Sequence, residues 1–215
     1  MLIAAGSKLV MIGDSITDAG RAQPVGEGLG GAYGGGYVNL INGLLGSNCP
    51  EQRIRVVNVG CSGHNVRDLK GRWERDVLNL NPDWVSVMIG INDVWRQFDL
   101  PLQPECHVYL PEYEKTLDEL VRGTLPSVKG IVLMTPFFIE PRRQDAMRAT
   151  MDRYGAVVRK LARRHGTLLV DTQAAYDKVL KHTPSAALAW DRVHPNTAGH
   201  LVLARAFLNA VEFKW

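Results

Sequence analysis

The sequence contains few cysteines and no long apolar run. Its three cysteines, Cys49, Cys61 and Cys106, are widely spaced and form no C-x-x-C pair. This spacing argues against a disulfide framework and against a thiolate zinc site. No segment approaches the roughly 20 apolar residues of a membrane-spanning helix, and the stretch from Met1 to Ser7 lacks the pattern of a signal peptide. We therefore expect a cytoplasmic protein that does not associate with membranes.

An excess of charge of one sign is also lacking. The 25 basic and 22 acidic side chains leave a formal net charge of only +3. The arginines at Arg142-Arg143 and Arg163-Arg164 are pairs rather than longer basic runs, so nucleic acid is not an expected partner. The histidines show no H-E-x-x-H spacing. We expect neither a metal ion nor another cofactor.

What is present is an alternation of short apolar runs and amphipathic segments along all 215 residues. The apolar runs predict buried parallel strands at Lys8–Ile12, Arg55–Val59, Trp84–Ile89, Gly130–Met134 and Thr167–Val170. Apolar residues in steps of three and four predict helices within Val66–Leu80, Met147–Leu161 and Leu201–Val211. We predict one α/β domain, residues 1–215, with a five-stranded parallel sheet between two helical layers.

Two stretches have no clear periodicity and are predicted to be irregular. Arg21 to Tyr37 is rich in glycine, and Asn92 to Pro111 carries several aromatic residues and prolines. Each follows the carboxyl end of a predicted strand, so each is a candidate wall of a pocket. The run Gly26-x-Gly28-x-x-Gly31 has the letters of a dinucleotide-binding fingerprint but does not directly follow the first strand, and we interpret it as part of such a wall.

A glycine, an aspartate and a serine follow the first predicted strand. The apolar run Val10–Ile12 ends in Gly13-Asp14-Ser15, which places Ser15 just beyond the carboxyl end of a strand. Open α/β sheets hold their reactive groups there. A solvated turn made of the same residue types is the alternative interpretation. Ser15 is a candidate nucleophile if a base lies close to it.

A candidate base lies near the other end of the chain. Asp191 and His194 are three residues apart. Because Pro195 disfavours helix at His194 and Asn196 is a good N-cap, we expect both side chains on a loop before the last helix. The aspartate would accept the Nδ1–H of the histidine and leave Nε2 free to activate Ser15. Alone, the pair also fits a capping aspartate beside a surface histidine.

Two further strands end in candidate donors for an oxyanion. Gly63 follows the second predicted strand and Asn92 follows the third. The N–H groups of Ser15 and Gly63 and the side-chain amide of Asn92 would then form an oxyanion hole at one edge of the sheet. A turn glycine and an Asx turn explain these residues singly, but they do not explain all of them in this order.

Together these blocks resemble the SGNH, or GDSL, hydrolase family. The matching residues are Gly13-Asp14-Ser15, Gly63, Gly90-Ile91-Asn92-Asp93 and Asp191-x-x-His194. The resemblance implies a flavodoxin-like sheet of order 2-1-3-4-5, Ser15 as nucleophile, and His194 and Asp191 as base and partner. It implies Ser15, Gly63 and Asn92 as oxyanion donors. Within the family, the chain is most similar to the cytoplasmic acetyl-xylooligosaccharide (acetylxylan) esterases of bacilli, which form large homo-oligomers and remove acetyl groups from xylan fragments.

Four residues beside these blocks are candidates for binding substrate: Asp14, His64, Trp95 and Trp190. His64 stands where the family usually has Asn or Asp. For Asp14 a role in holding its loop through backbone hydrogen bonds is also expected, and for both tryptophans core packing competes with stacking on a sugar ring.

Two other functions remain open on the sequence alone. A lysophospholipase or thioesterase would share the same residue blocks but would need an apolar channel for a long acyl chain. A catalytically inactive carbohydrate-binding protein on the same fold is the other alternative, because a fold does not determine a function.

Overall fold

The computed structural model describes residues 1–215. At its centre is an all-parallel sheet with the strand order β2-β1-β3-β4-β5. The strands are β1 (Lys8–Gly13), β2 (Arg55–Asn58), β3 (Trp84–Met88), β4 (Gly130–Met134) and β5 (Leu168–Val170). The predicted order is confirmed, and every strand boundary lies within one residue of its prediction.

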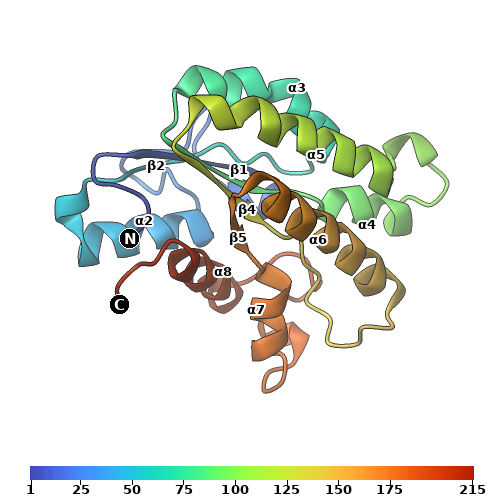
Figure 1. The fold of residues 1–215 in the computed structure, drawn as a ribbon. Coiled ribbons are helices and arrows are strands. Elements are labelled where there is room, and N and C mark those ends of the chain that lie inside the picture. The colour runs from blue at the N-terminus through green and yellow to red at the C-terminus, as the bar shows by residue number, and fades with distance from the viewer.

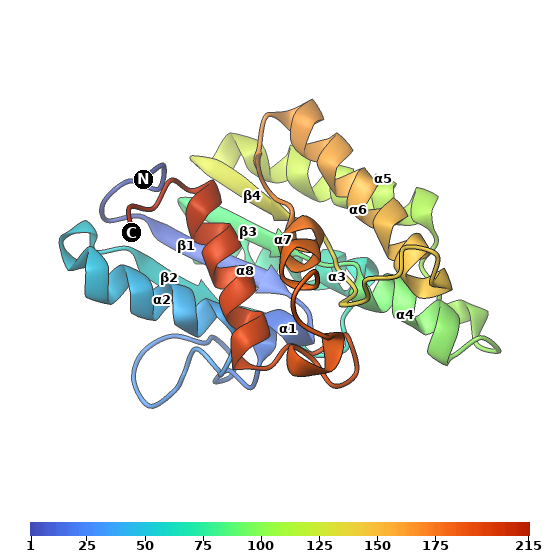
Figure 2. The same ribbon diagram turned by 90° about the horizontal axis from the view of Figure 1, so that it is seen from below.

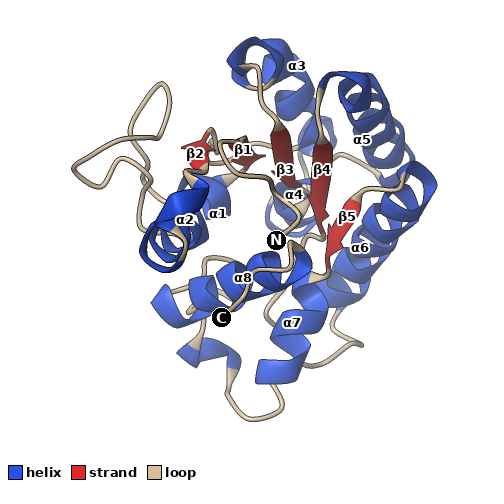
Figure 3. Ribbon diagram, turned by 60° about the vertical axis from the view of Figure 1, so that its left-hand side comes forward, coloured by secondary structure: helices blue, strands red, loops and turns tan.

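Helices cover both faces of the sheet, as Figures 1 and 3 show. Helices α2, α7 and α8 lie on one face, and α3, α4, α5 and α6 lie on the other. Their bounds are α1 (Ser15–Asp18), α2 (Tyr37–Asn48), α3 (Val66–Asp76), α4 (Ile91–Asp99), α5 (Leu110–Thr124), α6 (Ala146–His165), α7 (Thr172–Val179) and α8 (Thr197–Ala210). No helix combines the length and the apolar character that crossing a membrane requires.

The apolar runs of the sequence form the strands because both faces of the sheet are covered. In β3 all five residues are buried, and in β1 only Lys8 is partly exposed. These strands contribute to one continuous cluster of 54 buried apolar residues. Burial on both faces removes the need for alternating polar residues, so the strands are apolar throughout.

The stretch from Asn92 to Pro111 is not irregular throughout, and that prediction was wrong. Helix α4 occupies Ile91–Asp99, with Ile91 and Val94 on its buried side. The prolines that suggested a loop follow this helix, and Pro111 lies in the first turn of α5, where proline is well tolerated. Between Gly20 and Gly36 the chain forms neither helix nor strand, as expected.

The carboxyl ends of β1, β2 and β3 lie together at one edge of the sheet. Gly13 of β1 pairs with Met88 of β3, and Met11 pairs with Asn58 of β2. Figure 2 shows the one-turn helix α1 directly beyond β1 at this edge. Strand order changes direction beside β1, and open α/β sheets bind their ligands at such a point.

Candidate active site

Ser15 is held at the carboxyl end of β1 by a tight turn. It is the first residue of α1, and the preceding Asp14 caps this helix by accepting the N–H of Ile16 at 3.0 Å. A side chain at Gly13 would come within 2.5 Å of the carbonyl oxygen of Met88 on β3. Glycine is therefore required at this position for β1 to reach the turn.

The imidazole of His194 contacts the hydroxyl of Ser15. Its Nε2 lies 2.9 Å from Ser15 Oγ, and its Nδ1 lies 2.6 Å from Asp191 Oδ2. The other carboxylate oxygen of Asp191 accepts the backbone N–H groups of Val193 at 2.9 Å and of His194 at 2.8 Å. Burial raises the pKa of Asp191, but the hydrogen bonds from the His194 side chain and from both N–H groups outweigh it and leave the pKa lowered. Asp191 is thus an anion in position to orient the imidazole of His194.

The loop that carries these two residues is anchored at its exit. Asn196 caps α8 by accepting the N–H of Gly199 at 3.1 Å, as its position in the sequence predicts. Its own backbone N–H donates to the carbonyl of Leu188 at 2.7 Å. Arg192, between the acid and the base, adopts a positive φ of 64° and turns the chain back toward α8.

Gly63 lies in a four-residue turn at the same edge of the sheet. The N–H of His64 donates to the carbonyl of Cys61 at 3.3 Å, and Gly63 has a φ of 82°. A positive φ at the third residue of such a turn strongly favours glycine. The N–H of Gly63 donates to no backbone carbonyl, so it is available to a ligand.

The side-chain amide of Asn92 is fixed at both ends. Its Nδ2 donates to the carbonyl of His64 at 2.8 Å, and its Oδ1 accepts from Arg96 at 3.3 Å. These contacts use one of the two N–H bonds of Nδ2 and leave the second. Asn92 lies in the first turn of α4, which begins after Gly90 with a φ of 133°. The N–H groups of Ser15 and Gly63 and this amide are the three candidate oxyanion donors.

Two carboxyl groups are buried behind these residues. Asp14 caps α1, as expected of a residue that holds its loop, and Asp93 Oδ1 likewise accepts the N–H of Val66 at 3.1 Å. Burial raises the pKa of each to about 7, against the lowering effect of these bonds. Asp93 Oδ2 has no hydrogen-bond partner. Because the side chain of Asp14 is enclosed, we assign it to holding the nucleophile turn, in place of the predicted contact with substrate.

The other three candidates for substrate binding lie around the triad. The ring of Trp95 lies 5.8 Å from that of His194, and the side chain is half-buried. Trp190, beside Asp191, is 85% exposed, so the core-packing interpretation is wrong for it. His64 is partly buried, and its Nδ1 accepts from Arg72 at 3.0 Å. Burial and the charge of Arg72 lower the pKa of His64.

Sequence reasoning missed Arg72, which is buried beneath the site and contacts three of its loops. The apolar pattern of α3 contained a signal that this arginine is buried. Leu69 and Trp73 are buried on α3, and Arg72 lies three residues after Leu69, where an apolar side chain is expected. A buried arginine in such a stripe needs several hydrogen-bond acceptors, and the ends of strands provide them.

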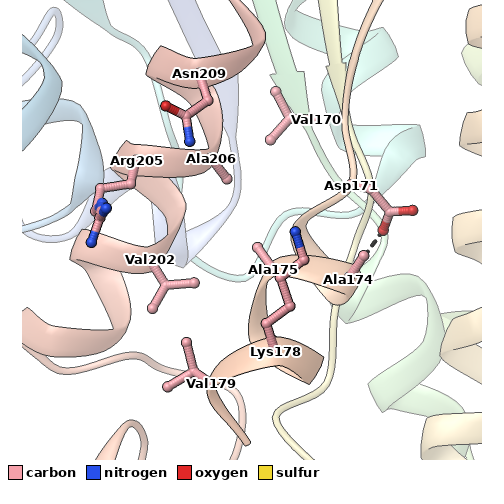
Figure 4. A pocket seen from close by; sticks show the side chains of 10 residues that line it. All are labelled: Val170, Asp171, Ala174, Ala175, Lys178, Val179, Val202, Arg205, Ala206 and Asn209. Carbon is pink, nitrogen blue, oxygen red and sulfur yellow. Dashed lines mark hydrogen bonds between the residues drawn. The ribbon is translucent and has the colours of Figure 1, made fainter. Parts of the chain in front are cut away.

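A hollow of about 410 Å³ lies away from the triad, between α7 and α8. Figure 4 shows Val170, Val179 and Val202 lining it, together with Lys178 and Arg205. It contains no residue of the triad or of the candidate oxyanion hole.

Known proteins resemble this chain over its whole length. A sequence model of the GDSL-like lipase/acylhydrolase family matches residues 11–202. A curated acetylxylan esterase from Geobacillus stearothermophilus is 62% identical over 215 residues, which are 100% of this chain and 98% of the relative.

Solved structures also resemble this chain over nearly its whole length. The crystal structure of Axe2, an acetylxylan esterase from Geobacillus stearothermophilus, matches with a TM-score of 0.99 at 62% identity, over 100% of this chain and 98% of that chain. Catalytic mutants S15A, D191A and H194A of Axe2 match as well. LAE5, an alpha/beta hydrolase enzyme from the metagenome of Lake Arreo in Spain, has a TM-score of 0.97 at 62% identity, covering 99% of this chain and 98% of its own. The chain therefore belongs to the GDSL-like lipase/acylhydrolase family and is a carboxylic ester hydrolase.

Proposed function

We propose that this enzyme is an acetylxylan esterase that removes acetyl groups from xylo-oligosaccharides through an acetyl-enzyme. The observation that carries the proposal is the hydrogen-bonded chain from Ser15 Oγ through His194 to Asp191. The 62% identity to a curated acetylxylan esterase along the full chain supports the substrate class. The catalytic mutants of Axe2 at positions 15, 191 and 194 support the same three residues.

The first half of the reaction forms the acetyl-enzyme. His194 Nε2 takes the proton of the Ser15 hydroxyl while Oγ attacks the acetyl carbonyl carbon, and the carbonyl oxygen becomes an oxyanion. The N–H groups of Ser15 and Gly63 and the Asn92 amide donate to this oxygen. The intermediate then collapses, the bond to the sugar oxygen breaks, and the imidazolium returns its proton to that oxygen.

The second half releases acetate. A water molecule gives its proton to His194 Nε2 and attacks the acetyl-enzyme, and a second oxyanion forms in the same position. Its collapse breaks the bond to Ser15 Oγ, which regains the proton. Asp191 stabilises the imidazolium in both halves because its lowered pKa keeps it ionised, and it is not itself protonated.

Acetate release from acetylated xylo-oligosaccharides by the wild type and by Ser15→Ala tests this function. The wild type is expected to release acetate, and the variant to lose turnover while remaining folded. A fluorophosphonate probe is expected to label Ser15; a folded wild type that neither labels nor turns over would instead be a carbohydrate-binding protein. Comparing acetyl with octanoyl esters separates this activity from that of a lysophospholipase or thioesterase, which would prefer the longer chain.

We further propose that residues 1–215 form one catalytic domain that acts in the cytoplasm as a homo-oligomer. Large apolar side chains on the surface, including Leu29 and Leu102, support association of copies, because exposed apolar groups are often contact sites. The three cysteines are free, as is usual in a reducing compartment. Light scattering is expected to give a mass above the 23.8 kDa of one chain, and a monomeric mass would contradict the oligomer.

A further inference from the structure

One buried arginine joins the strand that carries the nucleophile to the turn that carries an oxyanion donor. The guanidinium of Arg72 donates to the carbonyl of Gly13 at 2.8 Å and to that of Val59 at 2.6 Å. Its Nε donates to His64 Nδ1 at 3.0 Å. These acceptors lie at the end of β1, just after β2, and in the turn next to Gly63. The side chain is only 5% exposed.

Two of these three acceptors are close in sequence to a reacting group. Gly13 comes two residues before Ser15, and His64 follows Gly63 directly. The carbonyl of His64 also accepts the Asn92 amide. Arg72 therefore contacts a segment next to every one of the three candidate oxyanion donors.

The charges around Arg72 favour its hydrogen bond to His64. An arginine N–H donates to His64 Nδ1, so that nitrogen must be unprotonated, and burial and the Arg72 charge both lower the pKa of His64. The positive charge of Arg72 is balanced by Asp76, whose Oδ2 lies 3.0 Å from its Nη1. Asp76 therefore neutralises the charge of the arginine, and its other three hydrogen bonds all reach loops of the site.

The turn that contains Gly63 is also held by contacts that do not involve Arg72. Asp18 Oδ2 accepts both the N–H and the hydroxyl of Ser62, at 3.0 and 2.8 Å. Arg21 donates to the carbonyl of Gly60 at 2.7 Å. These contacts, and the hydrogen bond from the N–H of Cys61 to the carbonyl of Gly13 at 3.0 Å, do not involve Arg72. A change at Arg72 is therefore expected to leave the turn folded and to shift it slightly relative to the Ser15 strand.

We propose that Arg72 is a positioning residue for the oxyanion hole: its planar guanidinium sets the separation between the Ser15 turn and the Gly63 turn. The inference rests on the proposed oxyanion donors. A displacement of about 1 Å in such a site costs on the order of 100-fold in rate. Lysine keeps the charge but, with a single ammonium, lacks the fixed fork of donors that reaches three acceptors in different directions.

The test compares Arg72→Lys with Arg75→Lys, an exposed neighbour on α3 that shares the Asp76 carboxylate. With p-nitrophenyl acetate, Arg72→Lys is expected to lower kcat about 10- to 100-fold with KM changed less than about threefold. Phenylboronic acid, which mimics the tetrahedral intermediate on Ser15, is expected to lose the same factor in affinity. Arg75→Lys is expected to match the wild type. An Arg72→Lys enzyme with unchanged kcat and boronate affinity would overturn the proposal.

A second pair of variants covers the case in which Arg72→Lys does not fold. His64→Leu removes the acceptor of the Arg72 Nε–H, and His64→Gln keeps an acceptor. We expect His64→Leu to lose kcat and boronate affinity together, about threefold to tenfold, and His64→Gln to lose less. Equal kinetics in both variants would count against the proposal. A wild type that fails on acetylated xylo-oligosaccharides but hydrolyses p-nitrophenyl acetate contradicts the proposed substrate and leaves this inference standing.

Discussion

The two sides of the proposed active site are built in different ways. On the base side, Asp191 and His194 are three residues apart, and every hydrogen bond that orients the carboxylate comes from the same short loop. On the oxyanion side, Gly63 and Asn92 come from different strand ends and are held by contacts between distant segments, including those of Arg72. The base side is also open: the His194 side chain is 41% exposed.

This difference predicts that the two sides respond differently to substitution. Changes on the base side remove a chemical step and leave the fold nearly intact, because few tertiary contacts depend on those side chains. Changes on the oxyanion side alter both rate and stability, since the groups that place the donors are also buried structural groups. Activity and unfolding measured on the same variants therefore separate the two sides.

The largest expected effect is on the base side. His194→Ala removes the base, and Asp191→Asn removes the anion that fixes its tautomer and stabilises its protonated form. We expect kcat to fall about 10⁴- to 10⁶-fold in the first and about 10⁴-fold in the second. Turnover of p-nitrophenyl acetate and thermal unfolding of each variant test this. An Asp191→Asn enzyme within tenfold of the wild type would show that the local loop orients the base without the carboxylate.

A smaller loss of activity is expected at Asn92, the proposed oxyanion donor on α4. Asn92→Ala removes one N–H donor, for which a loss of about 10²- to 10³-fold in kcat is typical. It also leaves the carbonyl of His64 without its partner, so the variant is expected to unfold more easily than His194→Ala does. Asn48→Ala, which changes an exposed amide on α2, is the control. If Asn92→Ala lost activity but no stability, the two sides would not differ as described.

The pH dependence of stability is expected to have opposite signs on the two sides. Burial raises the pKa of Asp93 to about 7. Between about pH 4 and pH 7 the folded state keeps a proton that the unfolded state has lost, so the free energy of unfolding falls as pH rises, by up to about 1.4 kcal/mol per unit. Asp191 has a lowered pKa, and its stabilising contribution is present at neutral pH and is lost as pH falls through its folded pKa.

Chemical denaturation between pH 4 and pH 8 tests the Asp93 contribution. Asp93→Asn is expected to remove its part of the slope and leave the part due to Asp14, whose pKa is also raised to about 7. Glu74→Gln, an exposed acid on α3, is expected to keep the wild-type slope. Identical slopes in the wild type and Asp93→Asn would mean that Asp93 is not protonated in the folded enzyme near neutral pH.

The smallest expected effect concerns Trp190, at the open rim of the base side. Its ring is free to stack on a sugar, and we assign this contact about the 0.5–1.5 kcal/mol that stacking of two aromatic rings contributes. Trp190→Ala is therefore expected to raise KM for an acetylated xylo-oligosaccharide about twofold to tenfold. The kinetics with p-nitrophenyl acetate, which has no sugar, are expected to stay the same. Equal changes for both substrates would place Trp190 in the support of the base rather than in sugar binding.

The contrast between local and long-range contacts also explains which features could be predicted from the sequence and which could not. The strands were predictable because parallel strands covered on both faces are apolar runs. Asp191 and His194 were predictable as a pair because their contact is local. Helix α4 was not predicted, because the prolines that follow it obscured its short apolar side. Arg72 interrupts the apolar stripe of α3, but its contacts were not predicted. Two of its acceptors are backbone carbonyls 13 and 59 residues away along the chain, and backbone atoms leave no trace in the sequence.

Ser15 and His194 are 179 residues apart in the sequence, so the active site can form only after nearly the whole chain has been synthesised. A chain still emerging from the ribosome can complete β1 and its nucleophile turn long before the segment with the base exists. Esterase activity during synthesis therefore reports the docking of the final loop and α8, not the formation of β1 and its turn.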